Sequence, residues 1–533
     1  MGLHRAAQIP FEGANRVALD PGAKSVDHAD QLLGIGVSGA RQRQEGGARV
    51  FETPVLHQVA RLFQPVGPRR RRKADRGGKQ DRGGKAKRCH AVLLSGLLAT
   101  TGAAGGAAGA QGISEDDYIV FDPAQARLGQ LLFYDKILSG NRNISCGTCH
   151  HHAMAGADGV SLGIGQGGVG LGPERVAPDG DHRIRARVPR NAPALWNLGH
   201  RDVRALFHDG RVQTTDYPHW DFDTPAGDWL PAGLNSLLAA QALFPMASHA
   251  EMAGEHGQND VAGAVTQRID RGWPIIARRV RTIPDYGNAF VDAFPDIGRP
   301  AQVSIVQIAN ALAAFIGTEW RSHDTAWDDF VETGAPLPPG AERGRRLFFG
   351  RAGCSTCHDG PLFTDHGFHA AGLPSFGPGR TRRFDPIPRD VGRIGVTDRP
   401  KDAYRFRTPS LRNVALTAPY GHNGAIPTLR GMIRHMADPA ATTRDWTPRQ
   451  AGLPRVPWLA DADFVLRADR HEMARQAAAL DLQDVALSDR DVADIEAFLN
   501  CLTDRSPFDR PLGRPVAVPS GLPVDQPAIS SRP

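Results

Sequence analysis

Two short cysteine and histidine motifs carry the clearest chemistry in the sequence. Residues 146–150 read Cys-Gly-Thr-Cys-His and residues 354–358 read Cys-Ser-Thr-Cys-His, and together they use four of the six cysteines. The spacing Cys-x-x-Cys-His is the attachment motif of c-type haem, in which two thiols bond one porphyrin and the histidine binds its iron. The sequence therefore predicts two covalently bound haem c groups, attached at Cys146, Cys149, Cys354 and Cys357 and ligated by His150 and His358.

A zinc site or a redox-active dithiol pair is the alternative use of these residues. About 200 residues separate the two motifs, whereas zinc modules usually keep their ligands close together in the sequence. We therefore favour haem at both motifs. Cys501 is left unpaired, and we expect it to be a small buried apolar residue.

Positive charge is concentrated in one N-terminal segment. The formal net charge is +6 and the pI is about 9.1, yet residues 61–90 alone carry twelve Lys or Arg against two Asp. Residues 111–533 sum to −4, so the high pI does not indicate nucleic-acid binding. No apolar run reaches the roughly 18 residues that a membrane-spanning helix needs.

Residues 91–110 have the layout of a secretory signal peptide. A basic stretch at 85–88 precedes an apolar stretch at 91–100, and small residues follow that resemble a cleavage site. We expect residues 1–90 to be a non-structural extension from a mis-set start, and Gln111 to be the first mature residue. Export also suits haem c, which bacteria assemble outside the cytoplasm, and it predicts a periplasmic protein. The alternative is a low-complexity Ala/Gly linker.

Short amphipathic helices are expected directly before both haem motifs. Residues 128–133 and 344–348 each place apolar residues at helical spacing, so the chain contains an internal repeat at the level of domains. Longer helices are expected after Ser304 and Ser488, and strand patterns are scarce. The expected fold class is mostly α, with two cytochrome c-like haem domains in tandem and long loops. The expected parts are an N-terminal haem domain (111–333), a C-terminal haem domain (334–505) and a Pro-rich tail (506–533).

Beyond the haem motifs, the sequence resembles the bacterial di-haem cytochrome c peroxidase and MauG family. The resemblance runs from about Leu128 to Leu502 and rests on several motifs in a fixed order. After the first haem motif come Asn191-Ala-Pro193, Phe207-His-Asp-Gly-Arg211, Gln241-Ala-Leu-Phe-Pro245 and Glu251-Met252. After the second come Thr408-Pro-Ser-Leu-Arg-Asn413, Leu416-Thr-Ala-Pro-Tyr-Gly-His-Asn-Gly424 and a helix ending at Met436.

The resemblance implies that the N-terminal haem reacts with peroxide and that the C-terminal haem accepts electrons from a small donor protein. Glu251 matches the family's distal acid–base carboxylate, and Gln241 its amide neighbour. A carboxylate in an apolar pocket can move a proton from the inner to the outer peroxide oxygen, so that water leaves. Without the resemblance, Glu251 reads as a solvated loop carboxylate.

The resemblance also implies a distal ligand for the second haem. Met436 falls on the family's axial position, and a thioether there raises the haem potential relative to two histidines. Met432 is the runner-up, one turn earlier on the same helix face, whereas His435 points about 100° away. MauG uses a Tyr at this position, and no Tyr follows Tyr420 here, which favours peroxidase chemistry.

The family holds a calcium ion between the haems with one Asn side chain and two backbone carbonyls. The matching positions are Asn191, Thr417 and Pro419. Neutral oxygen ligands suit Ca²⁺, although each of these residues could equally serve a turn.

Two departures from the family pattern matter. In peroxidases that need reductive activation, a His in a Gly-rich loop blocks the peroxide site, but here the loop at 163–168 carries Gln166. Gln is a poor iron ligand, so we expect an open first haem that is active without pre-reduction. His151, His152 and His182 are alternative ligands, but we expect them to be ordinary surface histidines.

The second departure concerns the residue between the haems, often a Trp in the family. His208 occupies that place, and the segment 212–233, which contains Trp220 and Trp229, looks inserted. Electrons could pass through His208, through an inserted Trp, or directly between the haems.

Three functions are compatible with these features. The first is a periplasmic peroxidase that reduces hydrogen peroxide to water with electrons from a small cytochrome c or cupredoxin. Because residues 111–533 are mildly acidic, they would attract a basic donor protein by long-range electrostatics. The second is a MauG-like or oxygenase-type enzyme acting on a protein or organic substrate. The third is a di-haem electron carrier, which requires two six-coordinate irons and gives Glu251 and Gln241 no role. Family members are often dimers, so a homodimer is expected.

Overall fold

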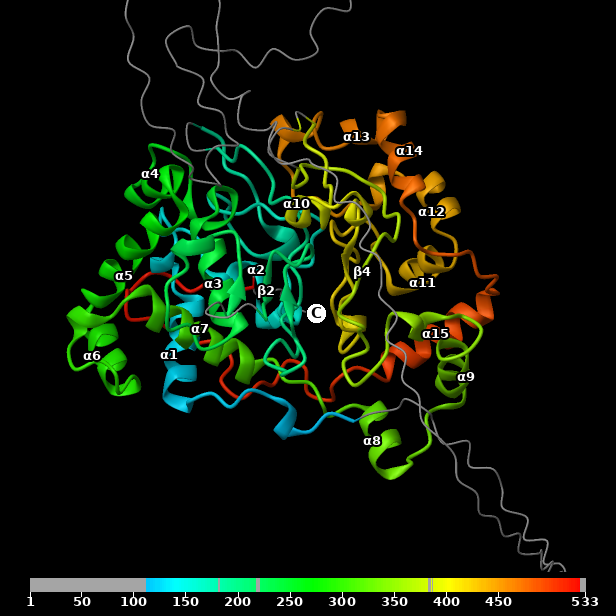
Figure 1. The fold of residues 1–533 in the computed structure, drawn as a ribbon, viewed down its shortest axis with the longest axis horizontal. Coiled ribbons are helices and arrows are strands. Elements are labelled where there is room, and N and C mark those ends of the chain that lie inside the picture. Colours follow the sequence, from blue (N-terminus) through cyan, green and yellow to red (C-terminus); the bar gives the residue numbers. More distant parts are fainter. Residues whose placement is uncertain (1–111, 181–182, 217–220, 382–384, 386, 528–533) are drawn as a thin grey trace, which may run out of the picture. The chain divides into compact units, whose positions relative to one another are not determined.

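Helices dominate the computed structural model, which describes residues 112–180, 183–216, 221–381, 385 and 387–527 (Figure 1). The predicted extension and signal peptide, the predicted mature N-terminus at Gln111, and also His182 and Trp220 lie outside the described residues. Within the described ranges, no helix is long and apolar enough to cross a bilayer. The prediction of a mostly helical fold is confirmed, and the strands are only two or three residues long.

Three helices form the centre of the first half of the chain. Helix α1 (Pro123–Tyr134) begins at Asp122, whose carboxylate accepts the free amide hydrogens of the first turn. It packs on α7 (Ile305–Glu319), which also contacts α3 (Leu237–Ala247). The α1–α7 crossing needs a glycine, because a Cβ at Gly129 would lie 1.9 Å from the carbonyl oxygen of Ala311.

The remaining elements of the first half surround this centre. Strand β2 pairs antiparallel with both β1 and β3, and its position shows that part of the predicted insertion at 212–233 forms a small sheet. These elements are α2 (Cys146–Cys149), β1 (Ala205–Leu206), β2 (Val212–Thr214), β3 (Phe222–Asp223), α4 (Asp260–Gln267), α5 (Trp273–Arg281), α6 (Pro284–Ala293) and α8 (Ala326–Thr333).

The second half repeats the central helix crossing. Helix α9 (Pro339–Phe348) packs on α15 (Asp489–Asn500), and a Cβ at Gly344 would lie 1.8 Å from the carbonyl oxygen of Asp494. In both halves, therefore, the helix that precedes a haem motif crosses a later helix at a glycine. Trp327 of α8 packs in the apolar cluster of this half, although the expected boundary at 333 assigned α8 to the first domain.

Short helices and one strand pair complete the second half. Strands β4 and β5 pair antiparallel, with Phe368 opposite Arg407. These elements are β4 (Phe368–His369), α10 (Ile394–Thr397), β5 (Phe406–Arg407), α11 (Leu429–Ala437), α12 (Pro439–Asp445), α13 (Val465–Ala468) and α14 (Arg470–Ala478).

The C-terminal tail returns to the first half of the chain, as the red segment of Figure 1 shows. The side chain of Gln130 on α1 donates a hydrogen bond to the carbonyl oxygen of Leu512 at 2.6 Å. Lys136 forms an ion pair with Asp525 at 2.6 Å, and Val518 is buried in the apolar cluster of the first half. The predicted Pro-rich tail is therefore an ordered strap up to residue 527.

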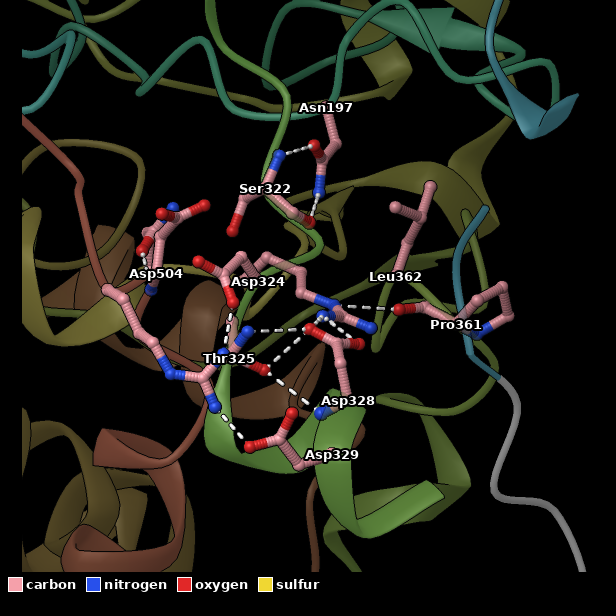
Figure 2. A network of polar contacts seen from close by, with 12 residues as sticks. Asn197, Ser322, Asp324, Thr325, Asp328, Asp329, Pro361, Leu362 and Asp504 are labelled. Carbon is pink, nitrogen blue, oxygen red and sulfur yellow. Dashed lines mark hydrogen bonds and ion pairs between the residues drawn. The ribbon is translucent and has the colours of Figure 1, made fainter. Parts of the chain in front are cut away.

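A buried ion pair lies where α8 meets the second half (Figure 2). One terminal nitrogen of Arg412 lies 2.7 Å from each carboxylate oxygen of Asp328, and both side chains are buried. Asp328 also accepts a hydrogen bond from Thr325 at the start of α8. The neighbouring Asp329 instead pairs at the surface with Arg505.

These two aspartates provide a matched test of the network. Asp328→Ala leaves the Arg412 guanidinium buried without its partner, and we expect the free energy of unfolding to fall by about 3–5 kcal/mol. Asp329→Ala removes an exposed pair and should cost about 0–1 kcal/mol. Chemical denaturation of the two purified variants measures the difference. Equal effects would show that the buried pair does not stabilise this junction.

Candidate active site

Both haem motifs present their histidines in the same way. Helix α2 is a single turn, and Ser145 and Thr148 cap it through their backbone and hydroxyl groups. Nδ1 of His150 donates to the carbonyl oxygen of Gly156 at 3.1 Å, and Nδ1 of His358 donates to that of Phe363 at 3.0 Å. Because Nδ1 carries the proton in this bond, the lone pair of each ring that is free to bind a metal lies on Nε2. Burial lowers the pKa of both imidazoles and so favours the neutral form that binds metal.

The two cysteine pairs do not come together in one metal-ligand cluster. Burial raises the pKa of Cys146 and Cys149 to about 12. Among the residues that the structure describes, the single cluster of three metal-ligating side chains contains Cys357, Asp365 and His369, so the two cysteine pairs do not converge.

A half-buried cation supports the fit to haem. Arg407 donates to the backbone carbonyl oxygens of Phe207 and Thr408, each at 3.3 Å, and burial lowers its pKa to about 10. Within the described ranges no carboxylate acts on it, since loss of solvent is the single cause of its lowered pKa. A buried guanidinium without an anion is costly, and a haem propionate is an anion of the required kind. The residues present therefore fit covalently bound haem c.

Glu251 lies beside the first cysteine pair. It sits on a π-helical turn (His249–Ala253) directly after α3, which carries Gln241. Its negative charge contributes to the raised pKa of Cys146 and of Cys149, which places it within electrostatic reach of both thiols. Both Glu251 and Gln241 are half-buried, and in the described part of the chain neither side chain has a hydrogen-bond or ionic partner. A polar pair left free at this place can act on a ligand.

The Gly-rich loop at 163–168 packs directly on the turn that carries Glu251. The amide hydrogen of Gln166 donates to the carbonyl oxygen of Glu251 at 2.9 Å. A Cβ at Gly165 would lie 1.8 Å from the carbonyl oxygen of Ala250, so only glycine permits this approach. Buried Arg175 holds the loop from the other side, because its guanidinium donates to three backbone carbonyls at 2.7–2.8 Å, those of Ile164, Gly165 and Gly170.

The side chain of Gln166 belongs to a network of amides. Its Oε1 accepts a hydrogen bond from Asn141 at 2.6 Å and a longer one from Asn143 at 3.3 Å. Its Nε2 donates to Gln258 at 3.3 Å, and Gln166 is only 7% exposed. These bonds occupy the side chain and hold it in one place. Motif spacing carried no signal for this network, because its members lie up to 117 residues apart.

The expectation that His151 and His152 are surface residues is wrong. They are 2% and 8% exposed, because the C-terminal strap covers them. Both ring nitrogens of His152 are engaged, by the Tyr134 hydroxyl and by Glu319. Nδ1 of His151 accepts from the amide of Ala153 at 3.1 Å.

Helix α11 carries the candidate distal ligands of the second haem. His435 is fully buried, and its ring nitrogens bond to Thr442 and to the carbonyl oxygen of Ala371, each at 2.8 Å. Met432 packs against the apolar cluster of this half. Met436 is half-buried and does not belong to that cluster, so of these three it is the one left for a ligand.

Two of the three predicted calcium positions share one neighbourhood. The Asn191 side chain donates to the carbonyl oxygens of Val160 and Ser161. Gly424 lies against Ser161 and Pro419, because a Cβ there would lie 2.6 Å from the former and 3.0 Å from the latter. Thr417 precedes Pro419 by two residues.

His208 links the two halves of the chain. Its Nε2 donates to the carbonyl oxygen of Asn191 at 3.0 Å, and its own carbonyl accepts from the amide of Arg407 at 2.7 Å. Burial lowers its pKa to about 3, so the ring is neutral. Nearby, His422 stacks on Phe406 with 3.6 Å between ring centroids. Trp229 of the predicted insertion instead lies under Arg268.

An ionic cluster that sequence reasoning missed joins the same halves. Arg190 pairs with Asp209 and with Asp390, each at 2.7 Å, and Arg211 also contacts Asp209. Burial alone would raise the pKa of Asp209, but Arg190 and Arg211 lower it well below its usual range. Arg190 and Asp390 are 200 residues apart, so no local pattern could have paired them.

Comparison with known proteins identifies relatives of this chain. Residues 123–335 match the family model of di-haem cytochrome c peroxidase. The chain is 29% identical over 318 residues to cytochrome c551 peroxidase of Pseudomonas aeruginosa, covering 59% of this chain and 72% of that protein. It is 26% identical over 314 residues to the methylamine utilization protein MauG of Methylorubrum extorquens, covering 59% and 68%. A crystal structure of a MauG-like protein associated with microbial copper homeostasis aligns at a TM-score of 0.49 and 27% identity, over 76% of this chain and 96% of that one.

Gly165 offers a test of the contact between the loop and the Glu251 turn. Gly165→Ala should lower the free energy of unfolding by about 1–3 kcal/mol through overpacking, and it should speed hydrogen exchange at the Gln166 amide. Gly263→Ala is the control, because its Cβ meets nothing within 4 Å on helix α4. That change should stabilise the protein by about 0.5–1 kcal/mol. If both variants are equally stable, the loop does not pack on the turn.

Proposed function

We propose that this chain is a member of the di-haem cytochrome c peroxidase and MauG family, and that it reduces hydrogen peroxide to water. A small cytochrome c or cupredoxin in the periplasm would supply the electrons. The observation that carries the proposal is the free carboxylate of Glu251 beside the first cysteine pair. A di-haem electron carrier would have no use for an unpaired, half-buried carboxylate at that place.

Each motif has a separate task in this proposal. The bound haems supply the iron that reacts with peroxide at the first motif and the electron relay at the second. His150 and His358 hold the two irons from the proximal side, with the ring orientation set by the carbonyls of Gly156 and Phe363. Their cysteines would hold the porphyrins, and the repeated helix crossing at Gly129 and Gly344 supports a tandem arrangement of two haem domains.

Glu251 and Gln241 act on the distal side of the first haem. Glu251 takes the proton from the inner peroxide oxygen and delivers it to the outer oxygen, which leaves as water. The carboxylate is free to do both steps because no described residue pairs with it. Gln241 orients the peroxide through its free amide. Hydrogen-bonding both oxygens keeps the ligand in the geometry that proton transfer needs.

No side chain of the Gly-rich loop would block the first haem in this proposal. The loop that carries a blocking His in some relatives carries Gln166 here, and the amide network already occupies that side chain. Arg175 and the Gly165 contact hold the loop in the arrangement that also supports Glu251. The enzyme therefore needs no reduction before its first turnover.

The haem at the second motif would supply electrons to the haem at the first. Met436 would help to hold the second haem, and its thioether would raise the potential of that haem. Half-buried His208 and the stacked Phe406–His422 pair lie where the two halves meet, and they offer a route through side chains. Asn191, Thr417 and Pro419 would hold a calcium ion in the same region, through neutral oxygens. A homodimer is part of the proposal by analogy with the family.

A MauG-like activity on a protein or organic substrate is the second candidate. The open first haem favours it as much as it favours peroxidase function, and the chain matches MauG at a similar identity. The absence of any Tyr after Tyr420 favours the peroxidase, because MauG uses a Tyr as distal ligand.

Glu251→Gln tests the central role directly. We expect kcat/KM for peroxide to fall about 10²–10⁴-fold, because the amide cannot shuttle the proton. Glu255→Gln is the control, since it makes the same change four residues away on a half-buried side chain. Peroxide-dependent oxidation of a reduced small cytochrome c gives both values. Full activity of the Glu251 variant, with both haems attached, would overturn the proposed function.

Met436→Leu tests the second haem. We expect the methionine-to-iron absorption band to disappear and the potential of that haem to fall, because the thioether is lost. Met432→Leu should leave the band and the potential unchanged, since it is a volume-conserving change in an apolar cluster. Optical redox titration measures both. Loss of the band in the Met432 variant, with the band kept in the Met436 variant, would show that Met432 is the ligand and Met436 is not.

A further inference from the structure

A chain of three buried polar side chains lies beside the first haem motif. The hydroxyl of Tyr134, at the end of α1, donates to Nδ1 of His152. Nε2 of His152 donates to a carboxylate oxygen of Glu319, at the end of α7, at 2.7 Å. Tyr134 and Glu319 are fully buried and His152 is 8% exposed. The tautomer is thereby set, because the phenol needs an acceptor and the carboxylate needs a donor.

The C-terminal strap closes this chain from outside. The backbone amides of Leu512 and Gly513 donate to the two oxygens of the Glu319 carboxylate at 2.9 and 2.7 Å. The carboxyl group therefore receives three hydrogen bonds, one of them from the imidazole. A carboxylate placed in this way behind an imidazole favours transfer of a proton to the other ring nitrogen.

The phenol ring lies against the haem-binding turn itself. A Cβ at Gly147 would lie 2.4 Å from two carbons of the Tyr134 ring. Gly147 stands between Cys146 and Cys149, the two residues that would carry the porphyrin. Of the tyrosines in the described part of the chain, Tyr134 alone combines contact with a haem motif and a histidine at its hydroxyl.

We infer that Tyr134 is a redox-active residue that gives one electron to the first haem centre after peroxide has oxidised it. The inference rests on the proposed function, because hydrogen peroxide is the oxidant. Peroxide takes up two electrons and two protons as it becomes two water molecules, and Tyr134 returns one of those electrons. Its O–H bond breaks as an N–H bond forms at Nδ1 of His152, which leaves a neutral tyrosyl radical. An electron from the second haem and the proton held by His152 then restore the phenol.

The geometry explains why this tyrosine is suited to the reaction. Oxidising a phenol without removing its proton produces a cation, which a buried site disfavours. A histidine already bonded to the hydroxyl accepts the proton with no side-chain movement, and Glu319 stabilises the imidazolium that forms. Tyr118 is equally buried, but its hydroxyl donates to the amide oxygen of Asn197, which does not accept a proton.

The test uses the diferric holoenzyme mixed with hydrogen peroxide and no electron donor, then freeze-quenched for electron paramagnetic resonance. Protein grown with ring-deuterated tyrosine identifies a tyrosyl radical by the narrowing of its signal. We expect the narrowed signal in the unchanged enzyme and in Tyr118→Phe. We expect it to be lost in Tyr134→Phe, which keeps the ring and its packing and removes only the hydroxyl.

A second variant covers the case in which Tyr134→Phe perturbs the site. Glu319→Gln keeps a carbonyl oxygen for the strap and for His152 but removes the charge, so the yield of the radical should fall while haem content is retained. A tyrosyl signal that persists in Tyr134→Phe overturns the inference, as does the absence of any tyrosyl signal in enzyme that consumes peroxide. If the unchanged enzyme consumes no peroxide, the proposed function fails and this inference fails with it.

Discussion

The backbone contact between the Gly-rich loop and the turn that carries Glu251 is the constraint on which the proposed peroxide site depends. Gly165 approaches the Ala250 carbonyl more closely than any side chain would allow, and the next amide bonds to the Glu251 carbonyl. This contact sets the position of Glu251, the proposed acid–base carboxylate, and the same loop places Gln166 in a network of amides. In the proposed site, the placement of the carboxylate and the absence of a blocking ligand therefore have one physical origin.

Long-range ionic and hydrogen-bonded contacts support this arrangement from both halves of the chain. Arg190 joins Asp209 to Asp390, and Arg187 bonds to Asp463 at 2.8 Å. The C-terminal strap adds a third connection, because Asp525 accepts a hydrogen bond from Thr148 within the first haem motif. Buried charged pairs of this kind tolerate little displacement, since a lost partner leaves an uncompensated charge. These contacts join the two halves of the described chain to each other, and the contact from Asp525 joins the C-terminal strap to the first haem motif.

Local patterns were enough to predict four of the helices, which are α1, α7, α9 and α15. Ser304 and Ser488 cap α7 and α15 with their capping boxes, as the sequence indicated, and the amphipathic segments before both motifs are α1 and α9. The expected surface position of His152 was wrong because the residues that bury it come from α7 and from the strap, more than 160 residues away. Helix periodicity and motif spacing report on neighbours in sequence, whereas these partners meet only in the folded chain.

The most direct test of an open, preformed site compares two redox states of the same enzyme. Peroxide-dependent oxidation of a reduced small cytochrome c would be measured from the first turnover, with enzyme kept diferric and with enzyme reduced beforehand by one electron. The locked loop and the bound Gln166 side chain predict that both forms turn over at once and at similar rates. Turnover that begins only after pre-reduction would contradict the account, because it would require a ligand on the first iron that must first be displaced.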